Sequence, residues 1–230
     1  MKFGVVTFPG SNCDQDMVYV LEDILGQSVE RLWHKDTDLK GVDCVVLPGG
    51  FSYGDYLRSG AIAKLSPIMG EVIKHANSGG FVLGVCNGFQ ILTESGLLEG
   101  ALLHNDNQRF ICKNIYLKPT TDQSGITKGL DNNKAYKIPI AHGEGRFYAS
   151  DEVIAKLESN NQVLFKYCTA EGEVIDEVNP NGSISNIAGI CNEGRNVFGM
   201  MPHPERAADK ELSNEDGRAM FESMLKFCQN

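Results

Sequence analysis

The hydrophobic positions of the chain fall into short apolar runs that alternate with amphipathic stretches. The first runs expected as strands occupy residues 2–8, 28–33, 42–47 and 81–85. Between them, residues 14–25 and 68–76 repeat apolar side chains at helical spacing, which predicts two helices. Strands that alternate with helices indicate a parallel, doubly wound sheet, in which binding sites lie at the carboxyl ends of the strands.

The pattern changes after residue 97, where strands follow one another with fewer helices between them. Further strands are expected over residues 109–118, 134–140, 162–168, 183–191 and 196–201. The last two flank a hairpin-like turn. Helices are expected over residues 151–157 and 213–228, the second capped by Ser213. We therefore expect one α/β domain over residues 1–230, with a mainly parallel, doubly wound sheet and helices on both faces.

A cysteine lies where one of these strands is expected to turn into a helix. The apolar run ends at Cys86, and a helical pattern begins within three residues. Gly84 and Gly88 stand two residues to either side, which permits a tight turn and a close backbone approach. This is a nucleophile elbow with cysteine in place of serine, and a helix N-terminus favours the thiolate. A buried, inert cysteine is the alternative, and the two glycines make it the weaker one.

A cysteine nucleophile needs a base, and the base needs an orienting group. Pro204 biases His203 towards extended backbone, in which residues i and i+2 point the same way. Glu205 would then hold the imidazole while the other ring nitrogen faces the thiol. A chance His-x-Glu in a surface loop is the alternative, and the presence of the elbow makes it the weaker interpretation.

The other histidines are rival candidates for the base. His142 also has a carboxylate two residues on, at Glu144, but a glycine stands on each side of that glutamate. His142 is therefore interpreted as part of a mobile contact or gating segment. His104 is expected in a turn, and His34 and His75 at the surface.

The glycine turn at residues 49–51 ends another expected strand. Its backbone N–H groups, including those of Gly50 and Phe51, together with the N–H of Asn87, would form an oxyanion hole over Cys86. A plain strand-ending glycine turn is the alternative, so this assignment depends on the rest of the site.

Composition and charge exclude several other classes of protein. The 230 residues carry a formal net charge of −9 without a basic cluster, so neither nucleic acid nor an anionic membrane is expected as a partner. Seven cysteines without a C-x-x-C pair suggest neither a disulfide framework nor a metal site. With no signal-peptide pattern and no apolar run near the length of a membrane helix, a cytoplasmic location is expected.

These motifs resemble a known family. Residues 84–90 resemble the nucleophile elbow of the class I glutamine amidotransferases, and residues 202–205 resemble their His-x-Glu end. More narrowly, residues 48–58, 141–147 and 201–206 resemble the glutaminase subunits of phosphoribosylformylglycinamidine synthases in purine biosynthesis. The resemblance covers nearly the whole chain and implies a glutamine amidotransferase type 1 domain with a flavodoxin-like fold.

The resemblance also implies a chemistry. Cys86 attacks the side-chain amide of L-glutamine, and His203 passes the thiol proton to the departing ammonia. Glu205 orients His203, and water then hydrolyses the glutamyl thioester. Gln90 is implied to contact the amino-acid end of the substrate, with an ordinary helix-surface glutamine as the alternative.

The same resemblance implies partners. Ammonia is expected to pass to a synthetase subunit that uses ATP and magnesium to convert formylglycinamide ribonucleotide into formylglycinamidine ribonucleotide, with a small accessory subunit in the complex. The chain has no G-x-x-x-x-G-K-[ST] loop, and no cofactor is expected in it. The glycine-spaced segments 51–58 and 142–146 are expected to shift on docking, which would leave the isolated chain a poor glutaminase.

Two other hypotheses remain open from the sequence. One is a stand-alone cysteine hydrolase or peptidase with the same elbow, which would act on amides without a partner. The other is a non-catalytic regulatory subunit, against which the intact Cys86, His203 and Glu205 argue.

Overall fold

The computed structural model describes residues 1–228, and its centre is one nine-stranded sheet. The strands lie in the order β2-β1-β3-β4-β11-β10-β9-β6-β7. Their bounds are β1 Lys2–Thr7, β2 Ser28–Trp33, β3 Cys44–Leu47, β4 Phe81–Val85, β6 Ile111–Pro119, β7 Tyr136–His142, β9 Val163–Cys168, β10 Ile187–Cys191 and β11 Val197–Met200. A separate pair is formed by β5 Ala101–Leu103 and β8 Arg146–Tyr148.

Strand direction divides the sheet into two parts. The strands β2, β1, β3, β4 and β11 are all parallel. Because β10 and β6 are each antiparallel to both of their neighbours, the other seven of the nine strands run the same way. The antiparallel strands β10 and β11 are joined by residues 192–196 alone, a turn too short for the crossover that parallel strands need. The expected mainly parallel α/β sheet is confirmed.

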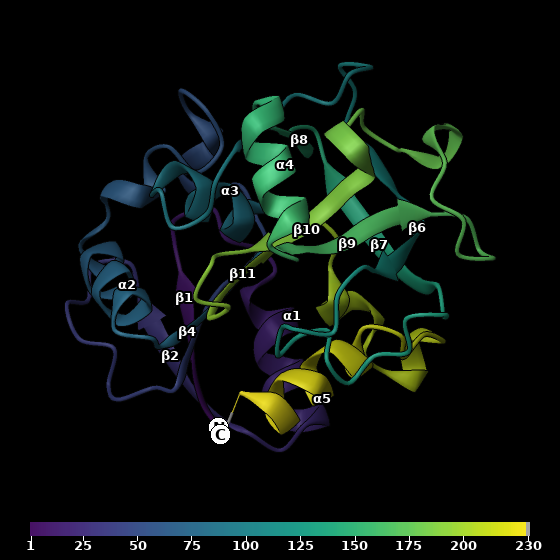
Figure 1. Ribbon diagram of the computed structural model, residues 1–230. Coiled ribbons are helices and arrows are strands. Elements are labelled where there is room, and N and C mark those ends of the chain that lie inside the picture. The colour runs from purple at the N-terminus through teal and green to yellow at the C-terminus, as the bar shows by residue number, and fades with distance from the viewer. Residues whose placement is uncertain (229–230) are drawn as a thin grey trace.

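Helices cover both faces of the sheet, as expected. The helices are α1 Asp14–Tyr19, continued by a π-helical turn over Val20–Ile24, then α2 Pro67–Asn77, α3 Asn87–Glu94, α4 Asp151–Ser159 and α5 Arg218–Phe227. Figure 1 shows α1 and α5 below the central strands and α2, α3 and α4 on the other side. No helix among residues 1–228 is long and apolar enough to span a membrane.

The last helix differs from its expected bounds, because it begins at Arg218 and not at Ser213. Ser213 has a φ of 56° and ends a short 3-10 turn, so the predicted Ser213 cap is wrong. The Asp216 carboxylate accepts a hydrogen bond from the backbone N–H of Lys137 at 2.8 Å and therefore anchors this segment to β7. The expected apolar face is present, since Met220, Phe221, Met224 and Cys228 are all buried.

The middle of the sheet is buried on both faces. Every residue of β3 is fully buried, and so are Val82, Leu83 and Val85 of β4. Such continuous apolar runs are typical of parallel strands that are covered by helices on both sides. This rigid centre fixes the carboxyl ends of β1, β3, β4 and β11, from which the candidate site is built.

Candidate active site

Cys86 is the single residue between β4 and α3, and its backbone is strained. Its φ of 51° and ψ of −107° lie in a backbone region that residues other than glycine rarely adopt. A Cβ at Gly88 would clash with the carbonyl of Leu47, and one at Gly84 would lie 2.6 Å from the carbonyl oxygen of Gly88. Gly88 is therefore required for the elbow to pack against β3, and Gly84 is required for α3 to pack closely on β4. The predicted strand-elbow-helix unit is confirmed.

The imidazole of His203 is paired with Glu205 in the interior of the protein. Nδ1 of His203 lies 2.6 Å from Oε1 of Glu205, and the two residues are 1% and 2% exposed. Burial disfavours the charged imidazolium, but Glu205 and then Cys86 outweigh it and raise the pKa of His203 well above its usual value. Nε2 of His203 has no hydrogen-bond partner among residues 1–228, so it is free to exchange a proton.

The pairing arises differently from the expected extended backbone. Pro204 starts a 3-10 turn over Pro204–Ala207, and Glu205 lies inside it. The backbone N–H of His203 is held by the carbonyl of Pro139, at 2.9 Å. The expected extended backbone is therefore wrong for this pair, although the predicted contact between His203 and Glu205 exists. The 3-10 turn that starts at Pro204 also brings the side chains of His203 and Glu205, at positions i and i+2, together.

Cys86 and His203 line one small cavity, of about 120 Å³, which Gly50 and Arg206 also line. The effect of Cys86 on the pKa of His203 reports the same proximity. The structure thus brings the predicted Cys86, His203 and Glu205 together, from the ends of β4 and β11. This arrangement has the parts of a Cys-His-Glu triad: a thiol, a base and an orienting carboxylate.

A second thiol, missed in the sequence, adjoins this group. Sγ of Cys13, His203 and Glu205 offer ligand atoms that lie within 4.8 Å of one another. Cys13 directly precedes α1, in the connection that follows β1, just as Cys86 directly precedes α3. This position between a strand and a helix was the available signal. The Arg206 guanidinium lies 3.1 Å from Sγ of Cys13, and this positive charge opposes the binding of a metal cation there.

Gly50 and Asn87, the expected donors of an oxyanion hole, both lie close to Cys86. Gly50 lines the cavity beside Cys86, and Asn87 is the first residue of α3. Position 50 requires glycine, because its φ is 147° and a Cβ there would lie only 2.7 Å from Cα of Ser11. The N–H of Phe51 donates to the carbonyl of Gly10 at 2.9 Å, so it is not available to a substrate. The oxyanion role of Gly50 and Asn87 stays a prediction.

Gln90 lines a second cavity beside Cys86, of about 140 Å³. Its Oε1 accepts a hydrogen bond from Nδ2 of Asn87 at 2.8 Å, and its Nε2 donates to the carbonyl of Glu144 at 2.6 Å. Gln90 therefore ties α3 to the segment after β7. Its contact with a substrate stays a prediction, and a surface position is ruled out because the residue is 5% exposed.

The rival histidines occupy different environments. His142 is the buried last residue of β7, and its Nδ1 lies 3.1 Å from Oδ1 of Asn105. Burial, and then the neighbouring His203, lower the pKa of His142 to about 4, so it is neutral at pH 7. His142 is thus held rigidly and is no part of a mobile loop, contrary to expectation. His34 was expected at the surface, but it is buried and bonds to Tyr53 Oη at 2.7 Å.

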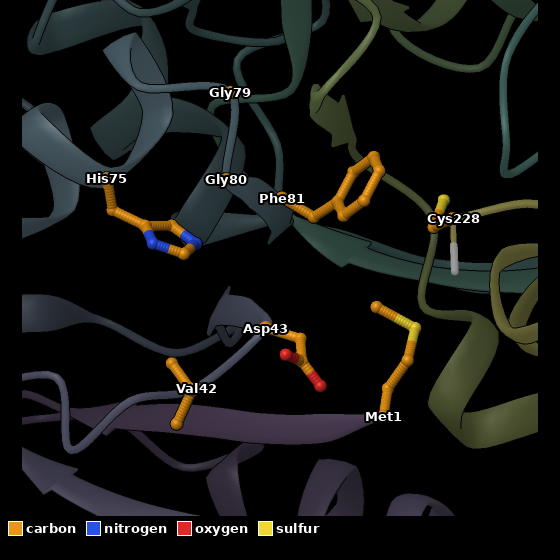
Figure 2. A pocket seen from close by; sticks show the side chains of 8 residues that line it. All are labelled: Met1, Val42, Asp43, His75, Gly79, Gly80, Phe81 and Cys228. Atoms are coloured by element: carbon orange, nitrogen blue, oxygen red, sulfur yellow. The ribbon is translucent and has the colours of Figure 1, made fainter. Parts of the chain in front are cut away.

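A larger cavity lies away from Cys86. It measures about 500 Å³. Figure 2 shows it between residues that precede or begin β1, β3 and β4, such as Asp43 and Phe81, with His75 of α2 and Cys228 also in its wall. None of the triad residues lines it. The size of a cavity therefore does not identify the active site here. Cys86 instead lines two smaller cavities.

Comparison with known proteins agrees with this geometry. Residues 1–228 match the family model described as a CobB/CobQ-like glutamine amidotransferase domain. Two curated relatives carry the name phosphoribosylformylglycinamidine synthase subunit PurQ. The one from Moorella thermoacetica is 55% identical over 100% of this chain and 97% of the relative, and the one from Koribacter versatilis is 54% identical over 98% and 97%.

Solved structures give the same result. The structure of PurLQS from Thermotoga maritima superposes with a TM-score of 0.86 at 41% identity, covering 99% of both chains. A glutamine amidotransferase from the same organism matches at 14% identity with a TM-score of 0.61, covering 100% of this chain and 99% of the other, which supports the fold alone. The family match, the near-complete coverage and the grouped Cys86, His203 and Glu205 lead to one conclusion: the chain belongs to the glutamine amidotransferase family with the CobB/CobQ-like domain.

Proposed function

We propose that this chain is the glutaminase subunit of a phosphoribosylformylglycinamidine synthase. The observation that carries the proposal is the buried pair of His203 and Glu205, 2.6 Å apart, beside the elbow that presents Cys86. The full-length relatives named as PurQ subunits supply the identity of the larger enzyme. L-glutamine is the substrate, and glutamate and ammonia are the products.

The geometry accounts for each proton in this reaction. Cys86 attacks the side-chain carbonyl carbon of glutamine while the free Nε2 of His203 holds the thiol proton. As the C–N bond breaks, His203 returns this proton to the leaving nitrogen, which departs as ammonia. His203 then takes a proton from water, whose oxygen attacks the thioester carbon. As the C–S bond breaks, that proton passes to the departing Cys86 sulfur and the thiol is restored. Gly50 and Asn87, both close to Cys86, are proposed to donate N–H groups to the oxygen that becomes negative in both steps.

The ammonia is proposed to serve an ATP-dependent synthetase subunit. That partner would hold ATP and magnesium and convert formylglycinamide ribonucleotide to formylglycinamidine ribonucleotide, with a small accessory subunit completing the complex. The name PurLQS of the similar structure supports an assembly of several subunits. No cofactor is proposed for this chain, and its location is proposed as the reducing cytoplasm, which suits seven unpaired cysteines.

Docking of the synthetase is proposed to activate the glutaminase. The segment after Gly50 holds Tyr53, Asp55 and Leu57 at positive φ values of 54°, 54° and 71°. Backbone in this region is strained by about 1–3 kcal/mol a residue, so a small change of contacts can rearrange the segment. Tyr56 and Leu57 project from it and are 73% and 93% exposed, which makes them available to a partner.

The test compares glutamate release by the purified chain alone and after addition of the synthetase subunit, ATP and formylglycinamide ribonucleotide. We expect a rise of about 10²–10³-fold, the range that one oxyanion donor controls. Equal rates would support the stand-alone hydrolase instead. A complex that forms but releases glutamate equally well with Cys86→Ala would support the regulatory subunit.

A further inference from the structure

The cavity that contains Gln90 has an unusual charge distribution. Cys86 opens into it, and Asp55 and Glu144 are its acidic residues. Among the residues that line it within the described part of the chain, none is lysine or arginine. The neighbouring Arg58 is turned away, because its guanidinium pairs with Glu94. A negative charge in this cavity is therefore left without a protein cation.

Neutral groups hold both carboxylates in place. The backbone N–H of Ser59 donates to Oε2 of Glu144 at 3.3 Å, and Nδ2 of Asn87 lies 3.5 Å from Oδ1 of Asp55. The other oxygen of Glu144 lies 3.5 Å from Nε2 of His104, whose side chain is 68% exposed. These contacts position the two acids but leave their charge largely uncompensated, because an exposed imidazole is a weak and screened partner.

The electrostatics record the same imbalance. Burial raises the pKa of Asp55 to about 6; a hydrogen bond from Ser59 opposes this shift, and the charge of Glu144 adds to it. Two carboxyl groups that face one cavity resist simultaneous ionisation unless a cation joins them.

His142 supplies an independent sign of a missing donor. Oδ1 of Asn105 accepts the N–H of Gly145 at 3.1 Å, while its Nδ2 donates to two carbonyls. Oδ1 is therefore an acceptor, so Nδ1 of His142 carries the ring proton and Nε2 offers a lone pair. His142 lines the cavity, is 2% exposed, and its Nε2 has no partner among the described residues. The cavity thus presents acceptors and lacks a donor that carries positive charge.

We infer that Asp55 and Glu144 bind the α-ammonium group of glutamine and so make the site specific for an α-amino acid amide. The inference rests on the proposed function, since it concerns the substrate of the same Cys86. An ammonium group has three N–H donors and a full positive charge, which matches two carboxylates and a bare imidazole nitrogen. Simple amides without this group lose the contact and bind weakly.

The test uses the assembled complex and two substrates that differ only in the α-amino group, L-glutamine and 4-carbamoylbutanoate. Asp55→Asn and Glu144→Gln keep the shape of each side chain and remove its charge. Each is expected to raise the KM for glutamine about tenfold or more with a small change in kcat, because hydrogen bonds to charged groups are among the strong ones. The KM for 4-carbamoylbutanoate should stay the same or fall. Glu152→Gln, on the exposed face of α4, is the matched control.

The outcomes separate this inference from the proposed function. If both substrates lose kcat/KM by the same factor in Asp55→Asn and Glu144→Gln, the carboxylates have a structural role and the inference is wrong. An unchanged KM for glutamine in both variants contradicts it as well. If the wild-type complex amidates its acceptor with ammonia but releases no glutamate from glutamine, the proposed glutaminase function itself fails.

Discussion

Sγ of Cys13 lies 3.1 Å from a guanidinium nitrogen of Arg206, on the same group of residues that holds His203 and Glu205. Two thiols, Cys13 and Cys86, therefore lie near one base. Only Cys86, however, has the elbow, the adjoining α3 N-terminus and access to both cavities. The chemistry is assigned to Cys86, and Cys13 is assigned to the packing around His203.

The two thiols are expected to respond differently to substitution. Cys86→Ala should abolish glutamine-dependent amidation by the complex while ammonia-dependent amidation continues, because only the glutamine step needs the nucleophile. Cys13→Ser should reduce glutamine-dependent kcat less than about tenfold, or about 1.4 kcal/mol in the barrier. Steady-state amidation rates of both variants, measured with glutamine and with ammonia as the nitrogen source, test these expectations. Normal glutamine turnover by Cys86→Ala would refute the nucleophile assignment.

The base and its orienting group should also differ in importance. His203→Ala removes the proton carrier and should lower glutaminase kcat by about 10²–10⁴-fold. Glu205→Gln should cause a smaller loss and shift the acidic limb of the pH–rate profile to lower pH, because Glu205 helps to raise the pKa of His203. The rate of thioester formation in a single turnover is measured for His203→Ala and, as the comparison, for His142→Gln. A loss in His142→Gln as large as in His203→Ala would reverse the ranking.

Gly49 is expected to be essential for activity, because no side chain fits between its backbone and the imidazole of His203. A Cβ at position 49 would lie 2.6 Å from Cε1 of His203 and 3.0 Å from Sγ of Cys13. Gly49→Ala should therefore displace the imidazole and lower kcat, with little change in the overall fold. The matched control is Gly70→Ala in α2, where nothing lies within 4 Å. That change should stabilise the chain by about 0.5–1 kcal/mol, since alanine favours helix. Equal kcat values for the two variants would contradict the assignment.

Asp55 is expected to destabilise the free chain at neutral pH. Its pKa is about 6 in the fold, above the ordinary value of about 3.9. A raised folded pKa favours folding at low pH, and this contribution is lost as the pH rises through about 6. Asp55→Asn, which needs no proton, should therefore have a higher Tm than the wild type at pH 8, and the difference should shrink towards pH 5. His104 and Glu144 face the same cavity and carry titratable groups. The Tm values with Asp55 and with Asn at position 55 are therefore also compared in the Glu144→Gln background. A difference that does not vary with pH would contradict the shift.

Local sequence determined the parts of this protein whose causes are local. Gly84, Cys86 and Gly88 predicted the elbow, because a sharp turn from strand to helix depends on neighbouring residues, although Gly88 packs against the distant Leu47. The apolar runs likewise predicted the strands of the sheet, since burial on both faces requires continuous apolar side chains. The pairing of His203 with Glu205 was also correct, although a 3-10 turn and not an extended strand produces it.

Tertiary structure decided what depends on residues far apart in the chain. The position of Cys13 beside His203, the burial of His34 and the start of α5 at Arg218 all follow from contacts between distant segments. The same holds for Asp55 and Glu144, which share one cavity although 89 residues (144 − 55) separate them. Hydrophobic periodicity reports which face of an element is buried and carries no information about which other element covers it. Only the folded sheet, by aligning the carboxyl ends of its parallel strands, assembled the site.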